Sequence, residues 1–201
     1  MEDTKGEGAR AALCAMRLDP GALAIDLDEM ARRPLPGGIA AAAAAAAMGA
    51  ALIAKSVQVA LRRAPGAQDR PEMEEMAGRA GRRAAELLGL ARADTEAYRC
   101  VLKTRAMAAD DPTRRRAWLA AVEVPLRLAE LALAMEEPIP ALFDRCPTVV
   151  HIDLQIGARL LQAASEGGRL AAEENLEKCE ESDERRALWL RLAALKETDV
   201  D

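Results

Sequence analysis

Apolar residues along most of the chain recur three, four and seven positions apart, a spacing that places them on one face of an α-helix. Proline and glycine clusters separate these stretches and mark the connections. The pattern predicts a short helix that ends at Asp19, followed by helices over residues 22–33, 39–63, 71–107, 113–136, 141–145, 148–179 and 183–196. No stretch alternates apolar and polar residues as a half-buried strand does. The sequence therefore predicts an all-α protein, a bundle of about six or seven helices.

The predicted helix over residues 39–63 is unusually poor in side chains, because eight consecutive alanines occupy positions 40–47. A helix with such small side chains buries little surface by itself. We therefore expect it to pack at short distance against another helix, in this chain or across the two-fold axis of a homodimer. Residues 37–54 carry no charge, which also fits a membrane span. The stretch is shorter than the ~20 residues of a span and alanine is only weakly hydrophobic, so a buried helix and no membrane partner are favoured.

Composition indicates a single domain with an aliphatic core. The 201 residues are 51% hydrophobic and only 2% aromatic, and they divide into an N-terminal extension, 1–20, and a helical domain, 21–201. The net charge of −5 argues against a nucleic-acid partner. The four cysteines stand far apart, as reduced thiols of a cytoplasmic protein do, and no apolar run near the N-terminus is typical of a signal peptide. With one histidine and no CxxC pair, we expect no metal site.

Two carboxylates fall on helix faces that are otherwise apolar. Their neighbours at helical spacing include Leu87, Leu90, Tyr98 and Val101 around Asp94, and Val149, Val150, Ile156 and Leu160 around Asp153. Burial raises the pKa of a carboxyl unless a cation or a hydrogen-bond donor contacts it. A buried carboxyl with a raised pKa is typical of a general acid or base. A structural alternative for Asp94 is a cap of a broken helix or an ion pair with Arg92 or Arg99. The alternative for Asp153 is the cap of a helix that starts late.

The segment before the alanines offers a candidate ligand contact. Pro36, Gly37 and Gly38 directly precede the predicted helix. Glycines at a helix entrance let backbone amides approach a ligand, and these amides together with the helix dipole favour an anion.

Other polar residues have a structural interpretation beside a functional one. Asn175 is either an interhelical hydrogen-bonding residue or a ligand contact, and Lys55 and Gln58 are expected at the solvent edge of the alanine-rich helix. Arginines 114–116 form either a solvated first helical turn or a basic cluster that steers an anionic ligand. His151 is expected to be structural or exposed.

Five landmarks in order resemble the cyclodeaminase/cyclohydrolase family, which includes the helical domain of formiminotransferase-cyclodeaminase and free-standing bacterial methenyltetrahydrofolate cyclohydrolases. The landmarks are PLPGGIAAAAAAAAMGAAL, DTEAY, VPL, IDLQ and a late asparagine, and the resemblance covers residues 23–195. It implies a formimidoyltetrahydrofolate cyclodeaminase or a methenyltetrahydrofolate cyclohydrolase. It also implies a homodimer with a folate groove near the subunit contact, and no cofactor besides the tetrahydrofolate substrate.

The same resemblance assigns roles to the candidate residues. The aspartate of DTEAY, Asp94, corresponds to the family's proton donor and acceptor. Asp153 and Asn175 would orient the substrate, and the entrance segment Pro36, Gly37 and Gly38 would contact it.

Several positions depart from the family pattern, among them Gln58 and Ala60 in place of a polar pair at the end of the alanine-rich helix. A threonine and the third glycine of the first motif are Leu35 and Ile39, the serine before Asp153 is Ile152, and the first late asparagine is Ala171. These losses of hydroxyl and amide groups leave a second hypothesis, a catalytically degenerate folate-binding or structural helical dimer. A third is an interaction module of a larger complex.

Overall fold

The computed structural model describes residues 30–64, 66 and 68–197, in which all regular secondary structure is helical. A helical turn at residues 30–32 precedes the main elements. These are α3 (Gly38–Arg63), α4 (Arg70–Thr104), α5 (Pro112–Glu136), α6 (Ile139–Arg145), the 3₁₀ turn η1 (Thr148–Val150), α7 (His151–Leu176) and α8 (Asp183–Glu197). The predicted all-α class is confirmed.

Most predicted helices have the expected bounds to within a few residues. The predicted helix over 148–179 begins as the 3₁₀ turn and ends at Leu176, and the one over 71–107 ends at Thr104. The Thr104 hydroxyl donates to the Cys100 carbonyl oxygen at 3.0 Å in that last turn. Of the predicted helix over 22–33, the first eight residues lie outside the described residues, as do the helix ending at Asp19 and the extension 1–20, so these predictions stay open.

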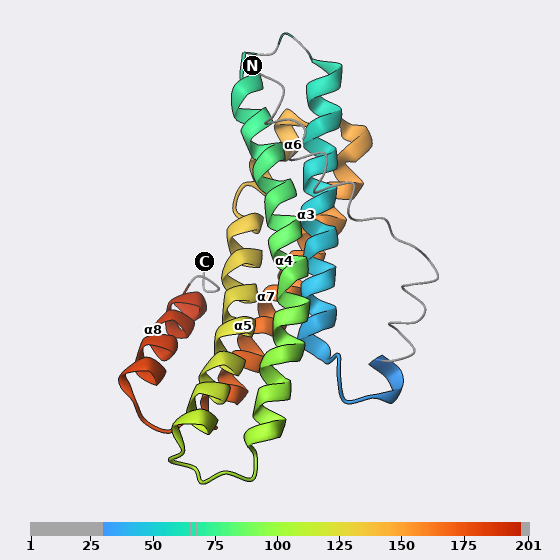
Figure 1. Cartoon of the computed structure of the whole chain (residues 1–201). Helices are drawn as coiled ribbons and strands as arrows, with labels where there is room; N and C mark the ends of the chain where they lie inside the picture. Colours follow the sequence, from blue (N-terminus) through green and yellow to red (C-terminus); the bar gives the residue numbers. More distant parts are fainter. Residues whose placement is uncertain (1–29, 65, 67, 198–201) are drawn as a thin grey trace, which may run out of the picture.

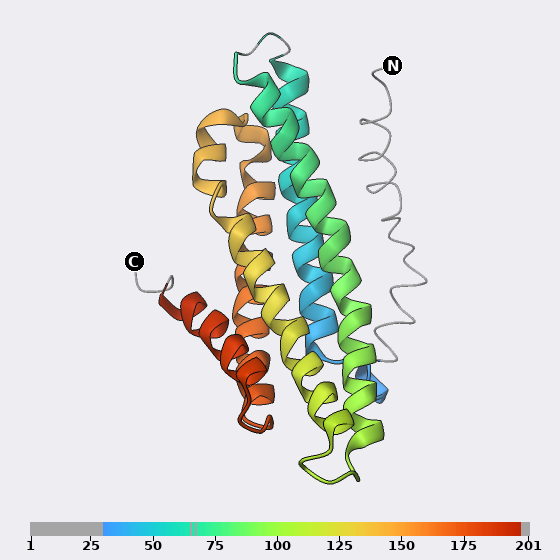
Figure 2. The same cartoon turned by 60° about the vertical axis from the view of Figure 1, so that its left-hand side comes forward.

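Four long helices form an antiparallel bundle (Figure 1). α3 packs against α4 and α7, and α5 packs against the same two helices. α6 lies at one end of the bundle, against α7 and α3, whereas α8 lies on the outer side of α5 and α7 towards the other end (Figure 2).

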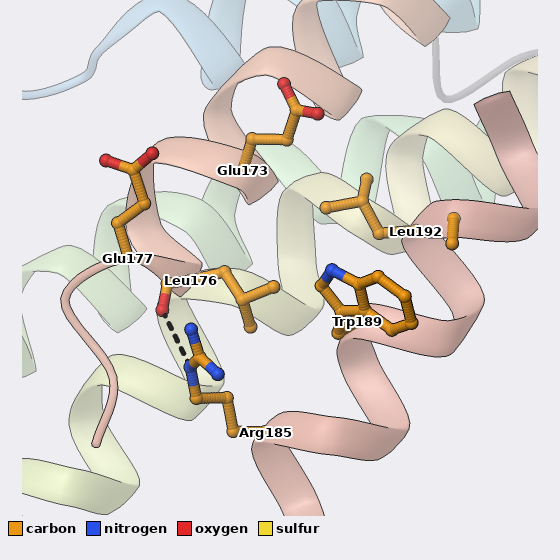
Figure 3. Close-up of a pocket in the computed structure, with 7 residues that line it drawn as sticks. Glu173, Leu176, Glu177, Arg185, Trp189 and Leu192 are labelled. Atoms are coloured by element: carbon orange, nitrogen blue, oxygen red, sulfur yellow. Dashed lines mark hydrogen bonds between the residues drawn. The ribbon is translucent and has the colours of Figure 1, made fainter. Parts of the chain in front are cut away.

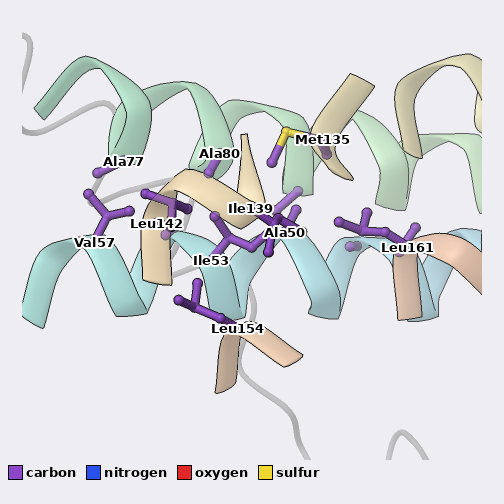
Figure 4. Packing of buried hydrophobic residues seen from close by; sticks show 14 of the residues in the cluster. Ala50, Ile53, Val57, Ala77, Ala80, Met135, Ile139, Leu142, Leu154 and Leu161 are labelled. Carbon is purple, nitrogen blue, oxygen red and sulfur yellow. The ribbon is translucent and has the colours of Figure 1, made fainter. Parts of the chain in front are cut away.

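The alanine-rich helix α3 supplies the centre of the core (Figure 4). Ala43, Ala46, Ala47 and Ala50 have no exposed surface, and larger side chains of α5, α6 and α7 belong to the same cluster. Their small size lets the neighbouring helices approach closely, as expected from the sequence.

The closest approach of α3 to α7 occurs where two glycines face each other. A Cβ atom added to Gly49 would lie 2.8 Å from the Gly157 carbonyl oxygen, and one added to Gly157 would lie 3.0 Å from the Gly49 carbonyl oxygen. Real Cβ atoms essentially never come within 3.0 Å of such an atom, so the crossing requires glycine at position 49, and a Cβ at position 157 would force the facing backbone to shift by a few tenths of an ångström.

Within the described residues, α3 is the one helix long and apolar enough to cross a membrane by length and composition. Core helices also pass this test, and the buried face of α3 is the centre of the bundle.

Candidate functional site

The entrance of α3 combines open space with backbone donors that have no partner within the helix. Gly37 is the N-cap residue and no side chain caps the helix there. The amides of Gly38, Ile39 and Ala40 have no carbonyl partner within the helix, because the first intrahelical bond runs from Ala41 N to the Gly37 oxygen at 3.3 Å. A Cβ atom added to Gly37 or Gly38 would meet nothing within 4 Å. These glycines therefore leave room that a ligand could use.

Asp94 lies on the stripe of α4 that faces the bundle, between the buried Leu87 and Val101. Its side chain is half-buried, and burial raises the pKa of its carboxyl. α4 runs unbroken through this position and Arg99 pairs with Glu96, so the structure supports neither a cap nor an ion pair with Arg99. Among the described residues, none is hydrogen-bonded or ion-paired to Asp94.

The hairpin of α3 and α4 brings Asp94 to the entrance of α3. Arg70, the first residue of α4, donates from Nη1 to the carbonyl oxygen of Leu61 near the end of α3 at 3.2 Å. Counting away from this turn at about 1.5 Å per residue sets Asp94 level with Gly38, to within about one helical turn. The catalytic candidate and the glycine entrance thus share one end of the bundle.

Asp153 has a cation partner on α3. It lies in the first turn of α7, and its Oδ2 is 2.8 Å from Lys55 Nζ. The Asp153 side chain is 20% exposed and that of Lys55 is 56% exposed. Val150 is the N-cap residue of α7, so Asp153 is not its cap. From the sequence, Lys55 was expected at the solvent edge of its helix, and its ion pair with Asp153 was not predicted.

The Lys55–Asp153 pair lies far from Asp94 within one chain. Lys55 is about 17 residues along α3 from the level of Asp94, which corresponds to about 26 Å. The structure of a single chain therefore separates the two carboxylates that the resemblance assigns to one substrate.

Asn175 has a structural partner that explains a proline inside α5. Pro125 has no backbone N–H, so the Ala121 carbonyl oxygen lacks its intrahelical donor. Asn175 on α7 donates from Nδ2 to this oxygen at 2.8 Å. Gly168 permits the close contact, since a Cβ there would lie 2.6 Å from the Pro125 oxygen. The interhelical interpretation of Asn175 is thus realised, and a substrate contact through its amide oxygen stays a prediction.

The remaining candidates have local structural partners. Arg114 and Arg116 donate to the carbonyl oxygens of Met107 and Pro112, and Arg115 pairs with Glu180. His151 Nε2 lies 2.9 Å from the Cys146 carbonyl oxygen. No group of three or more potential metal-ligating side chains occurs in the part of the chain that the structure describes.

A pocket between α7 and α8 was not anticipated from the sequence (Figure 3). It measures about 380 Å³ and is lined by Glu173, Leu176, Glu177, Arg185, Trp189, Leu192 and Ala193. Arg185 Nε donates to the Leu176 carbonyl oxygen at 3.3 Å, and the Trp189 side chain is 53% exposed. The pocket residues of α8 stand singly on a mainly polar helix, so their spacing in the sequence does not predict a pocket.

Two comparisons with known proteins bear on this arrangement. The family model described as formiminotransferase-cyclodeaminase matches residues 27–193. The fold is similar to the crystal structure of formiminotetrahydrofolate cyclodeaminase from Thermotoga maritima, with a TM-score of 0.75, 23% sequence identity and coverage of 83% of each chain. No individually curated protein matches the sequence significantly. Since the family match spans nearly the whole described bundle, the chain belongs to the formiminotransferase-cyclodeaminase family.

Proposed function

We propose that this chain acts on a one-carbon unit of tetrahydrofolate, as formimidoyltetrahydrofolate cyclodeaminase or as methenyltetrahydrofolate cyclohydrolase. Membership of the family supports this substrate class. The observation that carries the proposal is Asp94, a half-buried carboxylate with a raised pKa, level with the open entrance of α3. A carboxyl whose pKa burial raises is better suited to both give and take a proton than an exposed one.

Both candidate reactions need proton transfers at one carbon between two nitrogens. In the deaminase reaction the arylamine nitrogen of the folate attacks the formimino carbon and loses a proton, and ammonia leaves with a proton from the general acid. In the hydrolase reaction water adds to the methenyl carbon and loses a proton to the base, and one carbon–nitrogen bond then opens as the carbonyl forms and the leaving nitrogen takes a proton. Asp94 can serve as the acid and base in either case.

The entrance of α3 is proposed to hold the substrate. Pro36 orders the approach to the helix, and the amides following Gly37 and Gly38 can donate to an anionic group of the folate. Because both reactions consist of proton transfers and addition or elimination, we propose no cofactor besides the tetrahydrofolate substrate. We further propose a cytoplasmic homodimer.

The test is the absorbance of methenyltetrahydrofolate with purified wild type, Asp94→Asn and Glu96→Gln. Asparagine keeps the shape of aspartate but exchanges no proton, so Asp94→Asn should lower turnover by about 10²–10⁴-fold with little change in folate affinity. Glu96→Gln is the matched control, because it neutralises an exposed carboxylate of the same helix. A collapse of affinity in Asp94→Asn would assign Asp94 to binding instead.

A second candidate function is a folate-binding dimer without catalysis. The observation that favours it is Ile39, whose half-buried side chain stands where the family has a glycine at the helix entrance. Wild-type protein that binds methenyltetrahydrofolate but neither forms nor opens it would support this alternative. Protein that binds no folate would instead support an interaction module.

A further inference from the structure

The pocket between α7 and α8 is built from elements that the proposed folate site does not use. Its walls come from the end of α7 and from α8, whereas Asp94 and the glycine entrance belong to α4 and α3. Its volume of about 380 Å³ is at the lower end of the range for ligand pockets. Since a water molecule takes up about 30 Å³ in the liquid, the pocket has room for about a dozen non-hydrogen atoms. A ligand that binds there is therefore small.

An exposed indole forms part of the pocket wall. The side chain of Trp189 is 53% exposed, and the buried Leu176 and Leu192 lie beside it (Figure 3). An indole usually buries its large apolar surface, so its exposure in a pocket leaves a ring face for a ligand. The nearby Lys178 does not cover this ring, because its ammonium lies 5.5 Å from the centre of the Trp118 ring.

The charge that lacks a partner in this pocket is negative. Glu177 lines the pocket, and its side chain has no hydrogen bond or ion pair within the part of the chain that the structure describes. The pocket's guanidinium, that of Arg185, is already bound. Its Nε donates to the Leu176 carbonyl oxygen at 3.3 Å, and its Nη1 donates to Glu181. A ligand can therefore supply the cation that Glu177 lacks.

The charge around the pocket has the same sign. Residues 173–184 include seven acidic residues and one lysine, so this segment has a formal charge of −6, whereas the whole chain has −5. The lysine, Lys178, is held by Glu174 at 2.7 Å. Such a segment attracts cations and repels anions over a Debye length of about 10 Å at 0.1 M salt. The charge therefore disfavours an anion, such as a folate, in this pocket.

We propose that the α7–α8 pocket binds a small organic cation, an amine carried on an apolar body of about ten carbon atoms. The apolar body packs against Leu176 and Leu192, and the ammonium lies between the ring face of Trp189 and the carboxylate of Glu177. An ammonium gains both a cation–π contact and an ion pair in this position. A neutral or anionic ligand of the same shape gains neither.

The ligand class is tested with three compounds of similar shape: phenylbutylamine, phenylbutanol and phenylbutyrate, which are cationic, neutral and anionic. The measured signal is the indole N–H resonance of Trp189 in NMR titrations, with that of Trp118 as an internal reference. The amine should shift the Trp189 resonance saturably with a Kd of about 0.1–1 mM. It should bind about tenfold more tightly than the alcohol. No shift with the amine, equal affinities for the three compounds or tighter binding of the butyrate would overturn the proposal.

Three variants test where the amine binds. Glu177→Gln keeps the shape of the side chain and removes its charge, so it should weaken binding of phenylbutylamine about threefold and leave binding of phenylbutanol unchanged. Trp189→Leu keeps an apolar side chain at this exposed position and should also weaken amine binding about threefold. Asp183→Asn is the matched control and should leave amine affinity nearly unchanged, because Asp183 is an exposed carboxylate of the same acidic segment outside the pocket. Equal losses in Glu177→Gln and Asp183→Asn would show that the acidic surface, and not the pocket, attracts the amine.

Discussion

Asp94 shows how one residue can be costly to the fold and useful to chemistry. It occupies a position of α4 that apolar residues hold one turn before and after it, and no described cation neutralises it. The folded state therefore favours the protonated carboxyl, which is the physical cause of its raised pKa. A structural role would have been served better by leucine at this position.

The pH dependence of stability should reveal this cost. A carboxyl whose pKa is raised on folding contributes stability below its unfolded pKa and loses that contribution as the pH rises through its folded pKa. Asp94→Asn should therefore be more stable than wild type near pH 7 and approach the stability of wild type near pH 3, which is below the ordinary pKa of 3.8 for this carboxyl. Urea unfolding at both pH values measures the difference, in which the other carboxylates cancel. If the two proteins differed equally in free energy of unfolding at both pH values, burial of the Asp94 charge would not be the cause of the difference.

At the scale of elements, pairs of helices depend on specific complementary positions. The α3–α7 crossing needs Gly49 and is tightest opposite Gly157, and the α5–α7 contact depends on Gly168 and Asn175. α5 can continue through Pro125 because Asn175 replaces the missing backbone donor.

A double-mutant cycle tests this replacement. Asn175→Ala leaves the buried Ala121 oxygen unpaired and should lower the free energy of unfolding by about 1–2 kcal/mol. In a Pro125→Ala background the new backbone N–H can bind the same oxygen, so the Asn175→Ala cost should fall by about 1 kcal/mol. Denaturant unfolding of the four proteins gives the coupling. Strict additivity would mean that Asn175 stabilises the bundle in some other way.

Across the whole molecule, α8 stands apart from the four-helix bundle. Its buried Leu188 and Leu192 belong to a separate apolar cluster with α5 and α7. Arg191 ties it to α5 through Glu123 at 2.7 Å and Glu130 at 2.8 Å. An element with so few attachments is expected to open independently of the rest.

Arg191→Gln should loosen α8 selectively. Loss of the two partly exposed ion pairs is expected to cost about 1 kcal/mol, which raises amide exchange over residues 183–195 by about fivefold. Exchange in α3, α4 and α7 should not change. Arg186→Gln serves as the control, because Arg186 is an exposed residue of the same helix. Faster exchange throughout the bundle would show that α8 is part of one cooperative unit.

The sequence by itself determined the helical class, nearly all helix bounds, the small side chains along α3 and the position of Asp94 on an apolar stripe. Each of these depends on residues within a few turns of one another, so local spacing suffices to predict them. Short motifs in the sequence also indicated the resemblance to the family, and the family match confirms it.

Only the tertiary structure decided which side chains meet. Lys55 was assigned to solvent and binds Asp153 on another helix, and Asn175 meets the Ala121 oxygen, 54 residues away in sequence. Asp94 and Asp153 both lie on apolar stripes, yet the order and direction of the helices set them at opposite ends of one chain. Such contacts depend on how antiparallel helices pack, which is decided by the fit of whole helix surfaces, and the spacing of residues within one helix carries no information about it.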